Sequence, residues 1–288
     1  GKNEIDDAAL EKVQDAAIRD VVAKQEAVGL EVISDGEYRR LNWQVSFSDV
    51  EGWDLWEGSW RLFLQNPGHD AKKDEKPKTR GADAVEVFKV PATAKLRLSK
   101  NFPLKEYNSL KSATKNPAKA MIMGPDRVAQ MCDIPNSGPS YETADAFLKD
   151  VTKIQNEMVG ELVDAGCEYI QIDEPSYTGY VDKATLDRIA ARGEDPMKNL
   201  ARAVDATNGA IVGHEGKACF GVHICRGNRA SMWHREGTYE GIAEYLFANL
   251  KFDRLLLEYD SERAGGFEPL RYVPKGGPTV VLGLITTK

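Results

Sequence analysis

The sequence predicts an α/β fold, a TIM or (β/α)8 barrel, and three observations lead to this prediction. Short apolar runs alternate with longer amphipathic segments, which is typical of strand–helix units around a parallel sheet. The length of 288 residues suits one barrel domain, and 42% hydrophobic with 29% charged residues is ordinary for a globular protein. Polar and sulfur-bearing residues stand at the ends of several apolar runs, where barrel active sites lie.

Six apolar runs are expected to form barrel strands. They cover residues 30–34, 120–123, 169–173, 220–225, 254–258 and 279–284. Amphipathic spacing predicts helices at 7–28, 144–165, 183–207 (with a break at Pro196) and 239–250. Because a closed barrel needs eight strands, we expect the first strand to precede the printed residues and the last to follow them.

Residues 45–118 interrupt this alternation. The stretch is rich in Trp, Gly, Pro and Lys, and its run 73–80 is strongly charged. We interpret it as a long insertion, acting as a lid, within a single domain that spans residues 1–288. Inside it, residues 85–90 and 94–98 are expected to pair as a hairpin across Pro91.

Composition excludes several classes of partner. A net charge of −7 without any basic stripe argues against nucleic-acid binding. No apolar run approaches the ~20 residues that span a bilayer, and no signal peptide is visible. The four cysteines form no CxxC pair, so we expect reduced thiols in a cytoplasmic protein. A homo-oligomer is left open.

His223 and Cys225 are two residues apart on a predicted strand, so both side chains point to its inner face. Glu258 closes the next strand, where a buried carboxylate needs a compensating charge. Imidazole, thiolate and carboxylate together suit zinc. The alternative is that the His-x-Cys spacing is fortuitous and that Glu258 pairs with an arginine. Cys219 shares the inner face but lies roughly 20 Å from Cys225 along a strand, too far to share one metal.

A second group of candidate residues is acidic. Gln171 and Asp173 alternate with isoleucines and therefore point into the barrel, and Glu174 ends that strand. Asp35 and Glu37 end an earlier strand. Several carboxylates at one end of the barrel could bind a cationic amine or shift the pKa of a catalytic group. For Asp35 and Glu37 the alternative is an ion pair with Arg39 or Arg40.

Six ordered motifs resemble the cobalamin-independent methionine synthase family, in particular its C-terminal catalytic barrel and the short single-barrel members related to epoxyalkane:coenzyme M transferases. They are SDGEYRR at 34–40, MGP at 123–125, QIDEP at 171–175, HICRGN at 223–228, LLE at 256–258 and VLGL at 281–284. The matches span nearly the whole chain. QIDEP and the His-x-Cys-plus-Glu set are fairly specific when they occur together.

The resemblance implies a zinc-dependent transfer of a methyl or other alkyl group to a thiol such as homocysteine. It implies that His223, Cys225, Glu258 and a second cysteine, expected beyond Lys288, bind the zinc. Glu37 and Asp173 match positions that hold the substrate's amino group and are the expected catalytic residues. The remaining residues expected to bind substrate are Asp35, Trp43, Gln171, Glu174 and Tyr177.

One departure from the family leaves the alkyl donor open. Full-length methionine synthases carry a histidine, the proton donor to the folate, just after the strand that matches residues 280–284. Residues 283–288 contain no histidine. Methyltetrahydrofolate, an epoxide or another alkyl electrophile therefore all stay as candidate donors. A non-catalytic relative that binds zinc or thiols is the alternative outside enzymes.

Overall fold

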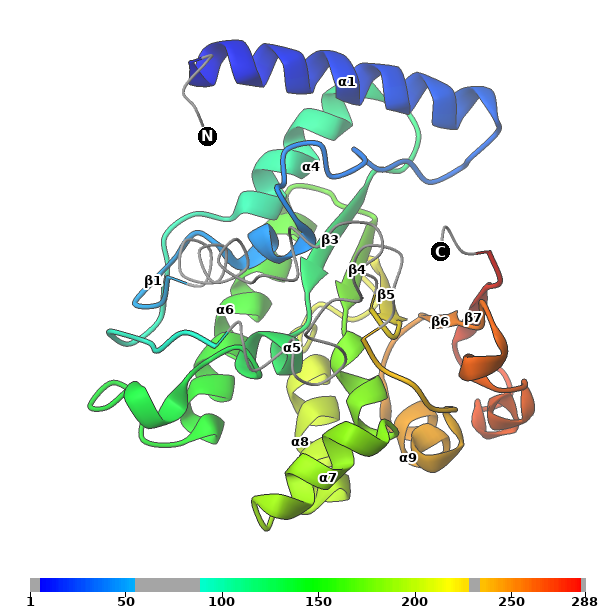
Figure 1. Ribbon diagram of the computed structural model, residues 1–288. Coiled ribbons are helices and arrows are strands. Elements are labelled where there is room, and N and C mark those ends of the chain that lie inside the picture. Colours follow the sequence, from blue (N-terminus) through cyan, green and yellow to red (C-terminus); the bar gives the residue numbers. More distant parts are fainter. Residues whose placement is uncertain (1–5, 55–88, 228–233, 286–288) are drawn as a thin grey trace, which may run out of the picture.

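The chain folds around a parallel sheet that most of its helices cover from one side (Figure 1). The computed structural model describes residues 6–54, 89–227 and 234–285. Five strands form the sheet in sequence order: β3 (Lys119–Met123), β4 (Tyr169–Asp173), β5 (Cys219–Ile224), β6 (Arg254–Glu258) and β7 (Thr279–Gly283). Ile33 adds a parallel bridge to Ala118, beside β3. Five of the six predicted strands are therefore confirmed, residues 30–34 contribute only the single bridge at Ile33, and the sequential parallel order is that of a TIM barrel.

Strand register brings the candidate residues to the same edge of the sheet. Asp173 of β4 lies opposite His223 of β5, and Glu258 of β6 lies opposite Gly283 of β7. Within β5 the alternation is as predicted, because Phe220, Val222 and Ile224 are fully buried and His223 is only half-buried. The strand thus turns its apolar residues to the helices and His223 to the inner face.

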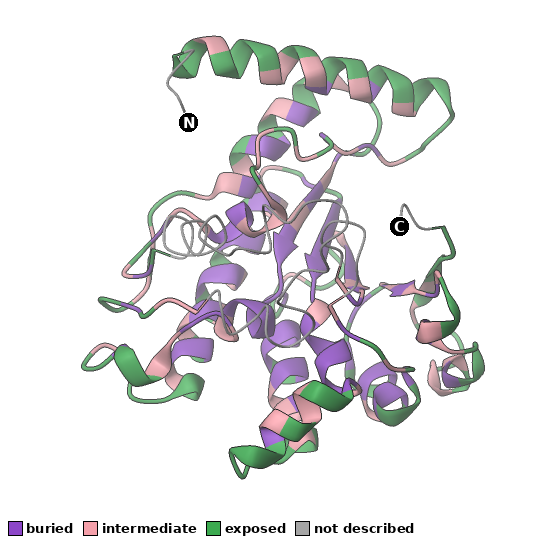
Figure 2. Ribbon diagram, in the orientation of Figure 1, coloured by how far each residue is buried: buried purple, intermediate pink, exposed green. Residues whose placement is uncertain are grey.

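The helices pack their apolar faces toward the sheet or toward one another, and their other faces are exposed (Figure 2). They are α1 (Asp7–Ala27), α4 (Phe102–Ala113), α5 (Pro125–Ala129), α6 (Ala144–Asp164), α7 (Lys183–Ala191), α8 (Pro196–Gly209) and α9 (Glu240–Asn249). Pro196 begins α8, where a missing N–H costs no hydrogen bond. None of the described helices is long and apolar enough to cross a membrane.

The helix α4 lies inside the stretch that we expected to be an insertion. Asn101 caps its first turn by accepting a hydrogen bond from the Leu104 N–H at 3.2 Å, and Tyr107 and Leu110 are buried. The helix contacts α1, α6 and β3, as the helix between two barrel strands does. This part of residues 45–118 therefore belongs to the barrel wall.

The described part of the expected hairpin across Pro91 pairs with other segments instead, and residues 85–88 lie outside the described residues. The short strand β2 (Arg97–Leu98) pairs antiparallel with β1 (Val50–Glu51), and Val90 bridges to Cys132. The Trp53 indole N–H donates to the Val90 carbonyl at 2.8 Å, which secures this long-range arrangement. Residues 55–88, the middle of the expected lid, lie outside the described residues, so the lid stays a prediction.

Candidate active site at the carboxyl ends of the strands

A chain of hydrogen bonds crosses the inner face of the sheet from β3 to β5. Lys119 Nζ donates to Gln171 Oε1 at 3.0 Å, and Gln171 Nε2 donates to Asp173 Oδ1 at 2.6 Å. The same Asp173 oxygen lies 2.9 Å from Nδ1 of His223. An ammonium group only donates and a carboxylate only accepts, so Nδ1 of His223 carries the hydrogen. Nε2 of His223 is thereby left for another partner.

His223 and Cys225 interact strongly. Burial alone would lower the pKa of His223, but the Cys225 charge and the bond to Asp173 raise that pKa well above its usual value. Burial would raise the pKa of Cys225, yet the charge of His223 and its hydrogen bond lower it. The two groups therefore favour each other's charged forms, and His223 shifts the Cys225 sulfur toward the thiolate, the form that acts as a nucleophile or a metal ligand.

Glu258 is held by arginine. One carboxylate oxygen accepts the backbone N–H of Arg226, and the other pairs with the guanidinium of Arg263. Arg263 also reaches Asp260 at 3.1 Å, and the Glu258, Arg263 and Asp260 side chains are only 10%, 7% and 5% exposed. The arginine partner left open as the alternative for Glu258 is therefore confirmed.

The expected zinc ligands are only partly assembled. In residues 6–54, 89–227 and 234–285, no group of three or more His, Cys, Asp or Glu side chains has an arrangement that could hold a metal ion. His223 on β5 and Cys225 directly after the strand fit as a nitrogen and a sulfur donor. Glu258 does not fit in this arrangement, because both of its oxygens are engaged. A zinc site stays a prediction.

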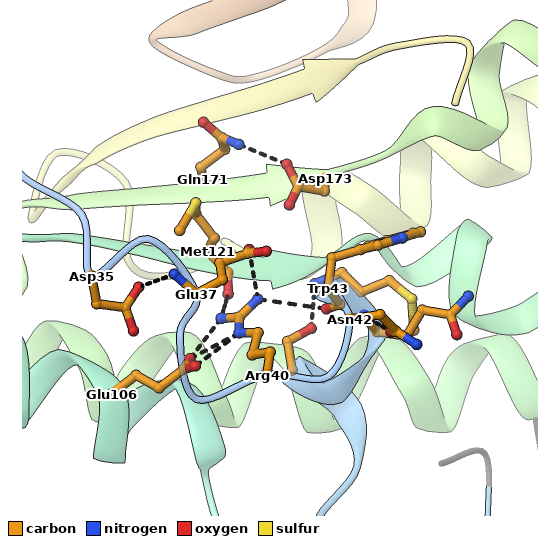
Figure 3. A network of polar contacts seen from close by, with 12 residues as sticks. Asp35, Glu37, Arg40, Asn42, Trp43, Glu106, Met121, Gln171 and Asp173 are labelled. Carbon is orange, nitrogen blue, oxygen red and sulfur yellow. Dashed lines mark hydrogen bonds and ion pairs between the residues drawn. The ribbon is translucent and has the colours of Figure 1, made fainter. Parts of the chain in front are cut away.

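The loop after Ile33 is anchored by Arg40, whose side chain is 2% exposed. Figure 3 shows its guanidinium between α4 and β3, where it bonds to both oxygens of Glu106 at 2.6–3.0 Å and to the Met121 carbonyl at 2.7 Å. It also pairs with Glu37 at 3.1 Å. The ion pair that the sequence left open for Glu37 is therefore present, and Arg40 fixes the position of the loop.

Asp35 and Glu37 form a tight turn at the inner edge of the sheet. The Glu37 N–H donates to Asp35 Oδ1 at 2.9 Å, and Glu37 has a φ of 58°, a left-handed value that is uncommon outside glycine. The second Asp35 oxygen is buried and has no hydrogen-bond partner in the described part of the chain. Arg39 pairs with Asp15 instead of Asp35. A strained turn and an unpartnered buried oxygen are features of ligand sites.

Glu37 and Asp173 lie close enough to sense each other's charge. Burial raises the pKa of Glu37, Arg40 opposes the shift, and the charges of Asp173 and Asp35 add to it. Burial would also raise the pKa of Asp173, but its bond to His223 lowers it. Two neighbouring carboxyl groups, one of which raises the proton affinity of the other, are suited to bind a substrate cation.

Glu174, expected at the mouth, instead ties two strand ends together. It accepts the backbone N–H groups of Asp126 and Arg127 at 3.0 Å each and the Ser176 hydroxyl. Gly124 makes this possible, because a Cβ there would lie 2.2 Å from a Glu174 oxygen. Glu174 is fully buried, so it holds the start of α5 and we do not include it in the proposed substrate pocket.

The two aromatic candidates differ in position. Tyr177 is fully buried, and its hydroxyl donates to Thr207 of α8 at 2.7 Å, so the ring belongs to the helix layer. Trp43 begins a 3-10 turn, η1 (Trp43–Phe47), and is half-buried with the Arg127 guanidinium 5.9 Å from its ring centre. Only Trp43 stays a candidate for contact with a substrate.

We expect a pH dependence of stability from Glu106. Burial raises its pKa to about 7, although Arg40 opposes the shift. A carboxyl group with a raised folded-state pKa stabilises the fold below its unfolded value and loses this contribution as pH rises. Between pH 4.5 and about 7 the loss is about 3 kcal/mol. Urea unfolding of wild type and Glu106→Gln across this range should give a steeper decline for wild type, and parallel curves would contradict the assignment.

The chain matches the family model for the cobalamin-independent synthase catalytic domain over residues 87–284. An uncharacterised Bacillus subtilis protein, YxjH, is 29% identical over 282 residues, 97% of this chain and 70% of that protein. A methionine synthase from Pyrococcus horikoshii is 24% identical over 250 residues, 86% of this chain and 58% of that protein. A Listeria monocytogenes crystal structure, described as a candidate vitamin-B12-independent methionine synthase, superposes with a TM-score of 0.72 at 28% identity, over 99% of this chain and 73% of that one.

Proposed function

Because the chain belongs to the cobalamin-independent synthase catalytic-domain family, we propose that it transfers a methyl or other alkyl group to the sulfur of a thiol such as homocysteine. The observation that carries the proposal is that a sulfur–imidazole pair and a pair of carboxyl groups lie together at one edge of the sheet. His223 lowers the pKa of the Cys225 thiol. Asp173 hydrogen-bonds to this His223, and its charge also raises the pKa of Glu37.

We assign Asp173 two roles, orienting His223 and binding the substrate's ammonium group. Its Oδ1 accepts from Gln171 and from His223, so the carboxylate holds the imidazole in one orientation. Its negative charge together with that of Glu37 provides a place for the ammonium group of an amino-acid thiol. A substrate whose ammonium group binds there would have its sulfur near the end of β5. Asp173 would then take part in both steps, because it binds the ammonium group and orients His223.

We propose that His223 and Cys225 would hold a zinc ion, and that Glu258 would join them only where its carboxylate is not held by Arg226 and Arg263. Zinc would supply deprotonation of the incoming thiol, whose pKa in water is about 8.5. The protein's own contribution is orientation: Asp173 holds His223, and Thr178 donates to the Cys225 carbonyl at 2.8 Å. These bonds place the two donor atoms before any ligand arrives.

The identity of the alkyl donor is a separate part of the proposal. Residues 283–288 contain no histidine to protonate a folate leaving group, which favours an electrophile that needs no such proton donor. An epoxide is the second candidate: the thiolate forms a C–S bond as one C–O bond of the ring breaks, and the alkoxide stays in the product and takes a proton from water. Trp43 is a candidate to pack against either donor.

A donor comparison tests the proposal. Purified protein with zinc is supplied with homocysteine and, in separate reactions, methyltetrahydrofolate, a simple methyl donor and a small epoxide. Mass spectrometry should detect methionine or the corresponding thioether in at least one reaction, and no product in any reaction of a His223→Gln variant. One bound zinc per chain without any thioether would overturn the proposal in favour of a zinc- or thiol-binding relative.

A further inference from the structure

The guanidinium group of Arg127 is buried, and one of its nitrogens has no hydrogen-bond partner. Arg127 is only 9% exposed, and its buried Nη1 atom meets no acceptor within residues 6–54, 89–227 and 234–285. A guanidinium only donates hydrogen bonds, and burying a charged donor without an acceptor costs free energy. A buried donor without a partner in the protein is a feature of a ligand site.

The two carboxyl groups that attract Arg127 are occupied elsewhere. The charges of Glu174 and Asp126 favour the charged form of Arg127. Glu174, however, accepts two backbone N–H groups and the Ser176 hydroxyl. Asp126 Oδ2 accepts the side-chain amide of Gln130 at 2.9 Å. These bonds hold both carboxyl groups in place, so they lower the cost of the buried cation without pairing with it.

The surroundings of Arg127 leave it charged but disfavour that charge. Burial and the repulsion by Arg235 lower the pKa of Arg127 to about 10, so its guanidinium is still positive at neutral pH. Arg235 differs in having partners, because it donates to the Pro175 carbonyl and to Gln130 at 3.2 Å. A buried cation that its own protein does not fully compensate favours the binding of an anion from outside.

Arg127 lies beside residues of the proposed reaction. Its guanidinium carbon is 5.9 Å from the centre of the Trp43 ring, and the charge of Cys225 is among those that favour its charged form. The strongest charge effect on Glu37 comes instead from Arg40. The Arg127 guanidinium and the Glu37 carboxylate therefore have different surroundings, and they are suited to different parts of the reacting molecules.

We propose that Arg127, beside Trp43, binds an anionic group of the alkyl donor, such as a carboxylate or a phosphate. This inference rests on the proposed function and names the class of its donor. In an amino-acid thiol the carboxylate and the ammonium group share one carbon atom, so this carboxylate is expected near Glu37. The cation at Arg127 is left for the second substrate, and Trp43 packs against the apolar part of that donor.

Calorimetric titration tests the site without any need for turnover. Inorganic phosphate and methyltetrahydrofolate, which carries carboxylates, are titrated separately into wild type, Arg127→Met and Arg271→Met. At least one of these anions should bind wild type, and Arg127→Met should weaken its binding by roughly 10–150-fold, as expected for the loss of one hydrogen bond to a charged group. Arg271→Met removes an exposed arginine that pairs with Glu240, and it should leave the affinity unchanged.

A second titration separates the donor from the thiol. Homocysteine and its decarboxylated analogue mercaptopropylamine both carry a thiol and an ammonium group, but only homocysteine has a carboxylate. For each of the two thiols, wild type and Arg127→Met should have equal affinities. Weaker binding of homocysteine by Arg127→Met, with unchanged binding of mercaptopropylamine, would assign the arginine to the carboxylate of the thiol and overturn the proposal.

The stability of the variants separates a ligand-binding arginine from a structural one. Because removing the Arg127 guanidinium leaves no hydrogen-bond acceptor unpaired among the described residues, Arg127→Met should unfold at the same urea concentration as wild type or at a higher one. A lower midpoint with unchanged anion affinity would show a structural role and refute the proposal. Arg127→Lys keeps the charge but not the two-pronged geometry, so it should retain part of the affinity and keeps the test available if Arg127→Met does not fold.

Two further results would overturn the inference: no binding of either anion by wild type, or equal anion binding by wild type and both Arg127 variants. The outcome is separable from that of the proposed function. Anion binding that depends on Arg127, in a protein that forms no thioether, would keep the anion site and remove only the function. Thioether formation with an anion affinity that does not depend on Arg127 would keep the function and remove only the anion site.

Discussion

Replacing Cys225 by serine is expected to abolish both zinc binding and alkyl transfer. A serine hydroxyl does not form the anion that the Cys225 thiol forms beside His223, where the neighbouring imidazole lowers the thiol's pKa. Loss of outer partners of metal ligands alone weakens binding by about 10–100-fold, so loss of a ligand should cost at least about 100-fold in zinc affinity. Elemental analysis and the thioether assay measure both effects on the same sample.

Cys219 provides a matched control for this substitution. It begins β5 on the same face as Cys225 but at the opposite end of the strand, and burial raises the pKa of its thiol. Cys219→Ser should therefore retain zinc and activity. Normal turnover by a zinc-free Cys225→Ser protein would refute the metal hypothesis, and equal losses in both variants would point to a general effect on the strand.

The inner-face residues could be predicted because a strand has a strict period of two. Once 220–225 is identified as a strand, the sides of Phe220 and His223 follow, and the structure has them on those sides. The sequence predicts that Asp173 and His223 lie at the same edge of the sheet, because parallel strands end there. It does not predict that they lie directly opposite each other, because the register depends on contacts across the sheet.

The partners of the charged residues could not be predicted in the same way. Arg40 pairs with Glu106, which is 66 residues away on a helix that sequence composition hid within an apparent loop region. Arg263 lies five residues after Glu258, and the 3-10 turn Glu262–Ala264 that contains it directs the guanidinium back to the strand end. Local periodicity says nothing about such turns.

The position of the Tyr177 side chain could not be predicted from local sequence either. It follows a strand end directly, which favoured a place at the barrel mouth. The 3-10 turn η3 (Pro175–Tyr180) instead rotates its ring beneath α8, where Thr207 accepts its hydroxyl hydrogen. A tyrosine that satisfies its hydroxyl inside the helix layer is a packing residue, and no feature of the linear sequence distinguishes the two directions.

Replacing Arg40 by methionine is expected to have the largest effect on stability. Its guanidinium is the partner of Glu106, Glu37 and the Met121 carbonyl, and the Glu106 side chain is only 6% exposed. Removing one partner of a buried ion pair typically costs about 3–5 kcal/mol, because the remaining charge is left without compensation. The cost should be largest above pH 7, where Glu106 is ionised.

An exposed pair separates this effect from a general loss of charge. Arg97 pairs with Glu51, but the two side chains are 69% and 53% exposed, so Arg97→Met should cost only about 0–1 kcal/mol. Adding Glu106→Gln to Arg40→Met should restore part of the stability, because the amide needs no counter-charge. Urea unfolding at pH 8 measures all four proteins. A loss below about 1 kcal/mol for Arg40→Met, or no recovery in the double variant, would show that the loop holding Glu37 is anchored by other contacts.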